Sequence, residues 1–164
     1  MDATRIIIIA VLVILQIVFG APAFLLGSDD YWLRALSYSF FHGNWWHLAV
    51  NCIAIGTVYK YPCKPCRDLL LPYIIAVLVY PLSLRPVIGF SNVLYAVLGL
   101  RTPSFKSKWW RQPAVIVFLV VTVALVFIPQ FSASTHIAAF LVGIAVASAK
   151  RGWLKLTRDA RRYF

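Results

Sequence analysis

Long uncharged stretches alternate with short charged segments along the 164-residue chain. The first stretch, Ile6 to Leu26, is long enough for a membrane-spanning helix of about 20 residues. Five more uncharged stretches follow, at residues 45–59, 69–84, 86–100, 112–128 and 134–149. The pattern predicts an all-α, polytopic membrane protein, a single domain over residues 1–164 with six transmembrane helices and a basic cytoplasmic tail at 150–164.

Composition supports this prediction and removes some classes of function. Hydrophobic residues make up 62% of the chain and charged residues 13%, against roughly 25% charged in a soluble domain. The acidic residues are five Asp with no Glu, so enzymes built on paired carboxylates are disfavoured. The run around Arg5 and Ala21-Pro22-Ala23 is also compatible with a signal peptide, an alternative that leaves the later spans unchanged.

The distribution of Lys and Arg predicts the orientation. Of the 16 Lys and Arg residues, 14 fall at the N-terminus, after spans two and four and in the tail, against Arg34 and Arg85 on the other side. Because cytoplasmic loops are the positive ones, both termini are expected in the cytoplasm. The net charge of +11 is then an orientation signal, and nucleic acid is not an expected partner.

The connection between spans one and two, residues 27–44, is long and apolar. It contains Tyr31, Trp32, Leu36, Phe40 and Phe41, so we expect it to pack on or into the outer leaflet. A long loop with structure of its own commonly has a function.

Strongly polar residues at membrane depth gather at one end of the predicted bundle. Polar groups are costly in the bilayer unless they have partners, so each is a candidate for function. The three histidines share the outer end with a Ser and two Asn. This set consists of His42, His47, Asn51, Ser91, Asn92 and His136.

Two helix faces predict that Ser91 and His136 meet. Residues three or four apart lie on one helix face, and small residues there let two helices approach closely. The face of span six that begins at His136 continues with Ala139, Gly143 and Ala147, and that of span four below Ser91 with Tyr95, Ala96 and Gly99. Packing these faces together would bring Ser91 within hydrogen-bonding reach of His136.

A Ser beside a His in a low-dielectric pocket is typical of nucleophilic catalysis with imidazole as general base. The acids lie in the outer loop or on the cytoplasmic side, so we expect a Ser/His dyad without a carboxylate. Tyr95 could support the imidazole by stacking, and His47 and Asn51 could donate to a developing oxyanion. His42 either shapes the loop or contacts substrate.

These residues resemble the rhomboid family of intramembrane serine proteases. His42-Gly-Asn-Trp-Trp-His47-Leu-Ala-Val-Asn51 is similar to the family's HxxxxHxxxN, and Gly89-Phe-Ser91 to its GxSG nucleophile motif. His136 with Ala139 and Gly143 resembles HxxGxxxG, while Tyr95 and Arg34 match the family's Tyr after the nucleophile and the Arg of its loop motif.

The resemblance implies a six-helix rhomboid-like bundle with Ser91 as nucleophile, His136 as general base, and His47 and Asn51 with backbone amides as oxyanion donors. It implies transmembrane proteins as substrates, cut near the outer face. No cofactor or metal is implied. We expect a multi-pass protein in the lipid bilayer of a prokaryotic plasma membrane. The resemblance implies no oligomeric state.

Three positions depart from the family pattern. Asn92 stands where the family usually has Gly, Ala139 replaces the first packing Gly of span six, and Trp32 precedes Arg34 by two positions instead of one. We expect Asn92 to occupy a tight backbone position, since Asn tolerates unusual φ better than most residues. A catalytically inactive relative that binds membrane clients is the alternative.

Two other interpretations of the sequence are less well supported. Cys63-Lys-Pro-Cys66 has the spacing of redox and zinc sites, but one pair supplies half a zinc site. A channel or transporter would need polar residues at mid-depth, whereas the strongly polar ones are gathered near the outer end.

Overall fold

The computed structural model describes residues 3–20, 29–58, 69–83, 87–102, 116, 120 and 133–160. The regular structure in these ranges is helical, which confirms the all-α prediction for this part of the chain. The helices are α1 (Ala3–Phe19), α3 (Tyr31–Ser37), the 3-10 helix η1 (Tyr38–Phe40), α4 (Trp45–Val58), α5 (Leu71–Val79), the 3-10 helix η3 (Tyr80–Leu82), α6 (Ser91–Arg101) and α8 (Ala133–Ala160).

Several predicted features lie outside the described residues. The fifth predicted span is represented only by Ile116 and Val120, and the Cys63 and Cys66 pair and Arg85 are not described. The same is true of all the residues at 60–67 and 103–111 in the two basic connections.

One described helix is long and apolar enough to cross a membrane, the segment Ala133–Lys155 of α8. Ala3–Phe19, Trp45–Val58 and the continuous stretch Leu71–Leu82 are apolar but shorter. The structure therefore supports a membrane helix at α8, and the count of six spans stays a prediction.

The helix bounds differ from the predicted spans. The first helix ends at Phe19, before Leu26, and α6 begins at Ser91, whereas the uncharged stretch starts at Pro86. The last helix runs on to Ala160 through the predicted tail. Hydrophobicity alone predicts which residues avoid water, but it does not separate helix from the non-helical residues 87–90 that precede α6.

Local sequence signals explain how several helices begin and end. Asp30 caps α3 by accepting a hydrogen bond from the Leu33 N–H at 3.0 Å, and Asn44 caps α4 through the His47 N–H at 2.8 Å. Pro81, which has no N–H to donate, lies in the 3-10 turn that ends the α5 helix.

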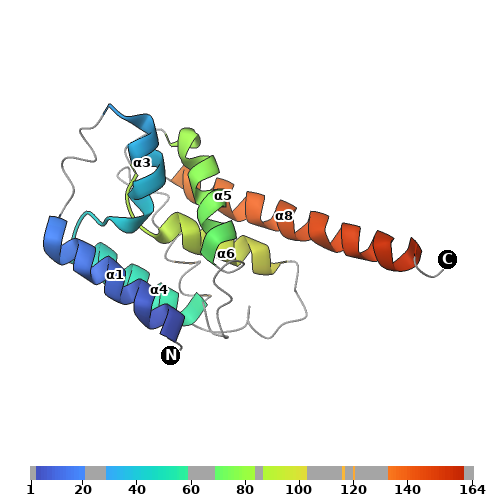
Figure 1. Ribbon diagram of the computed structural model, residues 1–164, viewed down its shortest axis with the longest axis horizontal. Helices are drawn as coiled ribbons and strands as arrows, with labels where there is room; N and C mark the ends of the chain where they lie inside the picture. Colours follow the sequence, from blue (N-terminus) through green and yellow to red (C-terminus); the bar gives the residue numbers. More distant parts are fainter. Residues whose placement is uncertain are drawn as a thin grey trace.

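The core is centred on α6, whose residues 92–99 are all buried. It packs most extensively against α8 and also against α5, while α1 lies beside α4 (Figure 1). Far from Ser91, the side chains of Arg5 and Arg101 both donate to carbonyls near the end of α4, those of Gly56 and Val58. Cations suit the negative end of a helix, and these two were predicted to share the cytoplasmic side.

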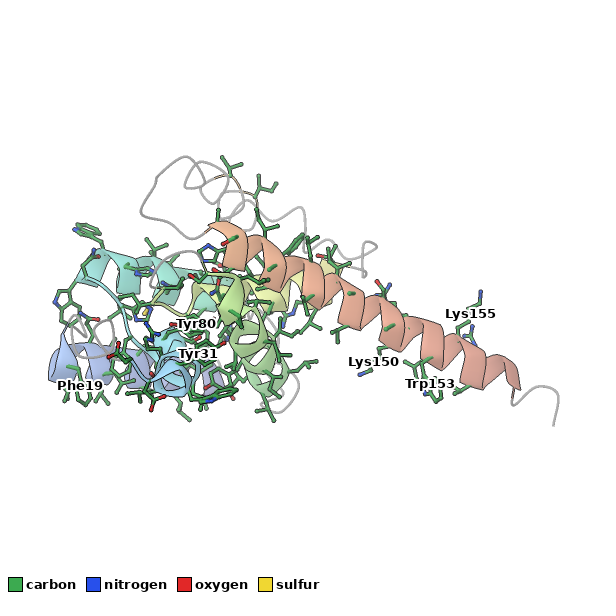
Figure 2. All side chains as sticks on the ribbon, turned by 90° about the horizontal axis from the view of Figure 1, so that it is seen from above. Phe19, Tyr31, Tyr80, Lys150, Trp153 and Lys155 are labelled. Carbon is green, nitrogen blue, oxygen red and sulfur yellow. The ribbon has the colours of Figure 1, made fainter. Side chains whose placement is uncertain are left out.

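The connection between the first two predicted spans contains short helices in its described part, residues 29–44. Its short helices α3 and η1 bury Ala35 and Tyr38, and the Tyr73 hydroxyl of α5 donates to the Leu36 carbonyl. The rings of Tyr31 and Tyr80 also meet, with centroids 5.7 Å apart (Figure 2). These contacts fasten the connection to α5.

The second half of α8 extends beyond the other helices. It carries Lys150, Trp153 and Lys155, all of them exposed (Figure 2). Basic and Trp side chains together are typical of the membrane interface.

Candidate active site

The two helices that carry the predicted dyad touch backbone to backbone. A Cβ added to Gly99 would lie 2.1 Å from the Phe140 carbonyl oxygen, and one added to Gly143 would lie 2.6 Å from that of Ala96. Ala139, which departs from the family pattern, is fully buried in the same core and does not prevent this contact. The small-residue faces therefore pack together as the sequence predicts.

This packing brings Ser91 and His136 together. Ser91 is the first residue of α6, His136 lies in the first turn of α8, and their Oγ and Nε2 atoms are 2.7 Å apart. The predicted hydrogen bond is thus present. The N-terminus of α8 is held in place by a second bond, from the Ser134 hydroxyl to the Leu82 carbonyl at 3.0 Å.

Tyr95 packs against the imidazole, as expected from its position one turn after Ser91. The ring centroids of Tyr95 and His136 are 4.8 Å apart with an interplanar angle of 50°. Tyr95 is 5% exposed and His136 7%, so the imidazole is held between buried groups and has little freedom to rotate.

The turn before Ser91 is built on Gly89. Its φ is +120°, a backbone conformation that residues with a Cβ rarely adopt. A Cβ there would also lie 2.5 Å from Cε1 of His47, so the imidazole of His47 rests directly on this turn. Glycine is required at this position for both reasons. The imidazole of His47 therefore contacts the backbone two residues before Ser91.

His42 contacts the same turn from the loop side. The Phe90 N–H donates to its Nε2 at 3.4 Å, and its ring lies 5.1 Å from that of His47. Burial, with a smaller contribution from His47, lowers the pKa of His42 from 6.5 to about 3, so His42 is neutral at pH 7. In the structure His42 shapes the turn, which is one of the two roles that the sequence leaves open for it.

His47 and Asn51 lie one turn apart at the start of α4. The Asn51 amide donates to the His47 carbonyl at 2.9 Å, and Asn51 is 3% exposed. One amide hydrogen is therefore engaged in its own helix, and the second is left to serve another acceptor.

Asn92 does not occupy a strained position, which corrects one expectation from the sequence. It lies in the regular helix α6, and among the described residues positive φ values occur only at glycines. Its side chain is fully buried and donates to the Tyr38 hydroxyl at 3.0 Å. The residue with the unusual backbone is Gly89, three positions earlier.

Arg34 is the candidate that the structure keeps away from the dyad. It lies on α3, close enough to Tyr80 to interact with its hydroxyl electrostatically. Trp32, on the same helix, is 67% exposed.

Two residues that position the site were not among the sequence candidates. Asn44 caps α4 below His47, and the sequence signal for it is an Asn directly before a helix of apolar residues. Tyr38 contacts the Ser91 turn, and no local pattern indicates it, because its partner Asn92 is 54 positions away.

Comparisons with known proteins add no family. No protein-family model matches the chain, and no curated protein matches it.

Proposed function

We propose that this protein is an intramembrane serine endopeptidase of the rhomboid type that cuts other membrane proteins. The observation that carries the proposal is the 2.7 Å contact between Ser91 Oγ and His136 Nε2 at one end of two closely packed helices. The chain forms this contact with no acidic side chain inside the predicted spans.

The proposed reaction begins with proton transfer from the Ser91 hydroxyl to Nε2 of His136. The Ser91 oxygen attacks the scissile carbonyl carbon, and the C=O electron pair moves to the oxygen. His136 then gives the proton to the departing amine nitrogen as the C–N bond breaks. A water molecule hydrolyses the acyl-enzyme by the same two steps, which regenerates Ser91.

Three groups are available to stabilise the oxyanion. His47 lies against the turn that precedes Ser91, and Asn51 retains one amide hydrogen. Ser91 also begins α6, and the first N–H groups of a helix lack partners within it and carry partial positive charge. Loss of one such donor typically lowers kcat about 10²- to 10³-fold.

The membrane setting is part of the proposal. Six spans, cytoplasmic termini and a site that faces outward account for the charge distribution and for the apolar surfaces of the shorter helices, and transmembrane segments are the proposed substrates. Exposed Ile7, Ile14, Ile17 and Ile53 fit contact with lipid.

Cleavage of a single-pass membrane substrate tests the proposal. Purified wild-type protein in liposomes should release product, and Ser91→Ala and His136→Ala should each abolish it. A serine-directed fluorophosphonate should label wild type and leave Ser91→Ala unlabelled. Absence of both cleavage and labelling in a folded wild type would refute the protease and favour the inactive, client-binding relative.

A further inference from the structure

Tyr38 contacts the chain on both sides of Ser91. Its backbone carbonyl accepts the Gly89 N–H at 2.9 Å, two residues before Ser91. Its hydroxyl accepts the Asn92 side-chain amide at 3.0 Å, one residue after Ser91. A single loop residue, 1% exposed, therefore holds the segment that carries the candidate nucleophile at two points.

The Tyr38 hydroxyl is itself fixed by α5, because it donates to the Ala76 carbonyl at 2.9 Å. In a regular α-helix that carbonyl would accept the Tyr80 N–H. Here the Tyr80 N–H bonds to Val77 instead, as the helix tightens into the 3-10 turn that contains Pro81. The irregular end of α5 thus leaves a carbonyl for Tyr38.

The hydrogen-bond directions follow from this arrangement. The Tyr38 hydroxyl gives its one hydrogen to Ala76, so toward Asn92 it must accept. Burial raises the pKa of Tyr38 to about 12, so the hydroxyl keeps its hydrogen at neutral pH. Among the described residues the Asn92 Oδ1 atom has no hydrogen-bond partner, while the side-chain nitrogen of Asn92 donates to the Tyr38 hydroxyl.

We propose that Tyr38 and Asn92 form a positioning pair that fixes the segment from Gly89 to Asn92, and with it the Ser91 oxygen, at hydrogen-bonding distance from His136. The inference rests on the proposed function and extends it. It gives Asn92, which differs from the Gly of the rhomboid motif, a role directed away from the Ser91 hydroxyl and toward the outer loop.

Two variants remove the bond from opposite sides. Tyr38→Phe deletes the hydroxyl, and Asn92→Ala deletes the amide. We expect each to lower kcat about tenfold with KM little changed, because the reacting oxygen loses its alignment while substrate binding does not depend on it. Tyr38→Phe also removes the bond to Ala76, so it should be the slower of the two. The double variant should be no slower than Tyr38→Phe, since the bond between Tyr38 and Asn92 is already absent in that variant.

Tyr73→Phe is the matched control. It removes another Tyr hydroxyl that joins the outer connection to α5, through a hydrogen bond to the Leu36 carbonyl instead of one to the Ser91 segment. It should lower the melting temperature while kcat stays at the wild-type value. A pair that acts only on stability would give the same pattern in Tyr38→Phe as in this control.

A second readout does not depend on activity. The chain has three histidines, so the ¹⁵N imidazole signals of His136 can be assigned by comparison with His136→Gln. Tyr38→Phe and Asn92→Ala should shift the His136 Nε2 signal, because the bond to Ser91 weakens, and Tyr73→Phe should leave it in place.

The outcomes separate the two proposals. Cleavage that depends on Ser91, together with wild-type kcat and unchanged His136 signals in both variants, would overturn the positioning pair and leave the protease standing. A wild type with no Ser91-dependent cleavage would overturn the protease, and the His136 signals would then decide the pair. If Tyr38→Phe does not fold, Asn92→Ala tests the same bond.

Discussion

Replacing Gly99 by Ala should separate the two helices that bear the candidate dyad. The new Cβ would lie 2.1 Å from the Phe140 carbonyl oxygen, and ordinary contact begins at 3.4 Å, so α6 and α8 would have to part by about 1.3 Å. Even half of that displacement, carried along α6 to Ser91, would lengthen the 2.7 Å distance to His136 to about 3.3 Å. That is beyond the usual range for a hydroxyl hydrogen bond.

The expected result is a loss of kcat/KM of about 100-fold, the effect of a misplacement near 1 Å, with about 1–3 kcal/mol of destabilisation from overpacking. Liposome cleavage assays and thermal unfolding measure the two effects. Gly143→Ala, whose Cβ would lie 2.6 Å from the Ala96 oxygen, should be affected less. Gly56→Ala, with nothing within 4 Å of its Cβ, is the control expected to behave as wild type. Wild-type cleavage by Gly99→Ala would refute the argument that this packing sets the dyad geometry.

Three further changes probe the surroundings of the dyad. Tyr95→Ala should lower kcat roughly tenfold by removing the ring beside His136, while Tyr95→Phe, which keeps the ring, should retain most activity in the same cleavage assay. The pKa of His42 is about 3 in the folded protein against 6.5 unfolded, so the unfolded state takes up the proton first and stability falls as pH drops from 6.5 toward 3. By pH 5 the loss of stability amounts to ~2 kcal/mol. The fall in melting temperature between pH 7 and pH 5 should therefore be smaller in His42→Gln than in wild type. An equal fall in the two proteins would count against the buried neutral imidazole. Asn44→Ala should cost about 1 kcal/mol through loss of the α4 cap, measured by thermal unfolding, and a stability equal to wild type would show that the cap is not used.

The sequence contained enough to predict how α6 and α8 meet. Small residues at intervals of three and four define a face on each helix, and those faces fix where Ser91 and His136 stand. The contact of Tyr95 with the imidazole follows from the same spacing. Periodicity is a local property, so the parts of the site that lie on one helix face can be read from it.

The parts that depend on the path of the loop could not be predicted in this way. Tyr38 reaches Asn92 because η1 packs between α5 and α6, a tertiary arrangement that no spacing within the loop specifies. The starting point of α6 was also missed, since apolar residues continue through the non-helical residues 87–90 before Ser91, and the backbone of Gly89 marks the change. Asn92 was expected to have unusual backbone dihedral angles because it stands where the family motif has Gly. A comparison with a motif considers each position separately.

The length of α8 has a consequence for where on a substrate the proposed cut falls. Residues 136 and 150 belong to one unbroken helix and lie about 21 Å apart along its axis. In the proposed topology, with Lys150 at the cytoplasmic interface of a core about 30 Å thick, His136 would stand about 9 Å beneath the opposite surface. The helix then sets a constant distance between the cytoplasmic interface and His136. Each additional 3 Å of bilayer thickness would therefore move the scissile bond about two residues further into a helical substrate.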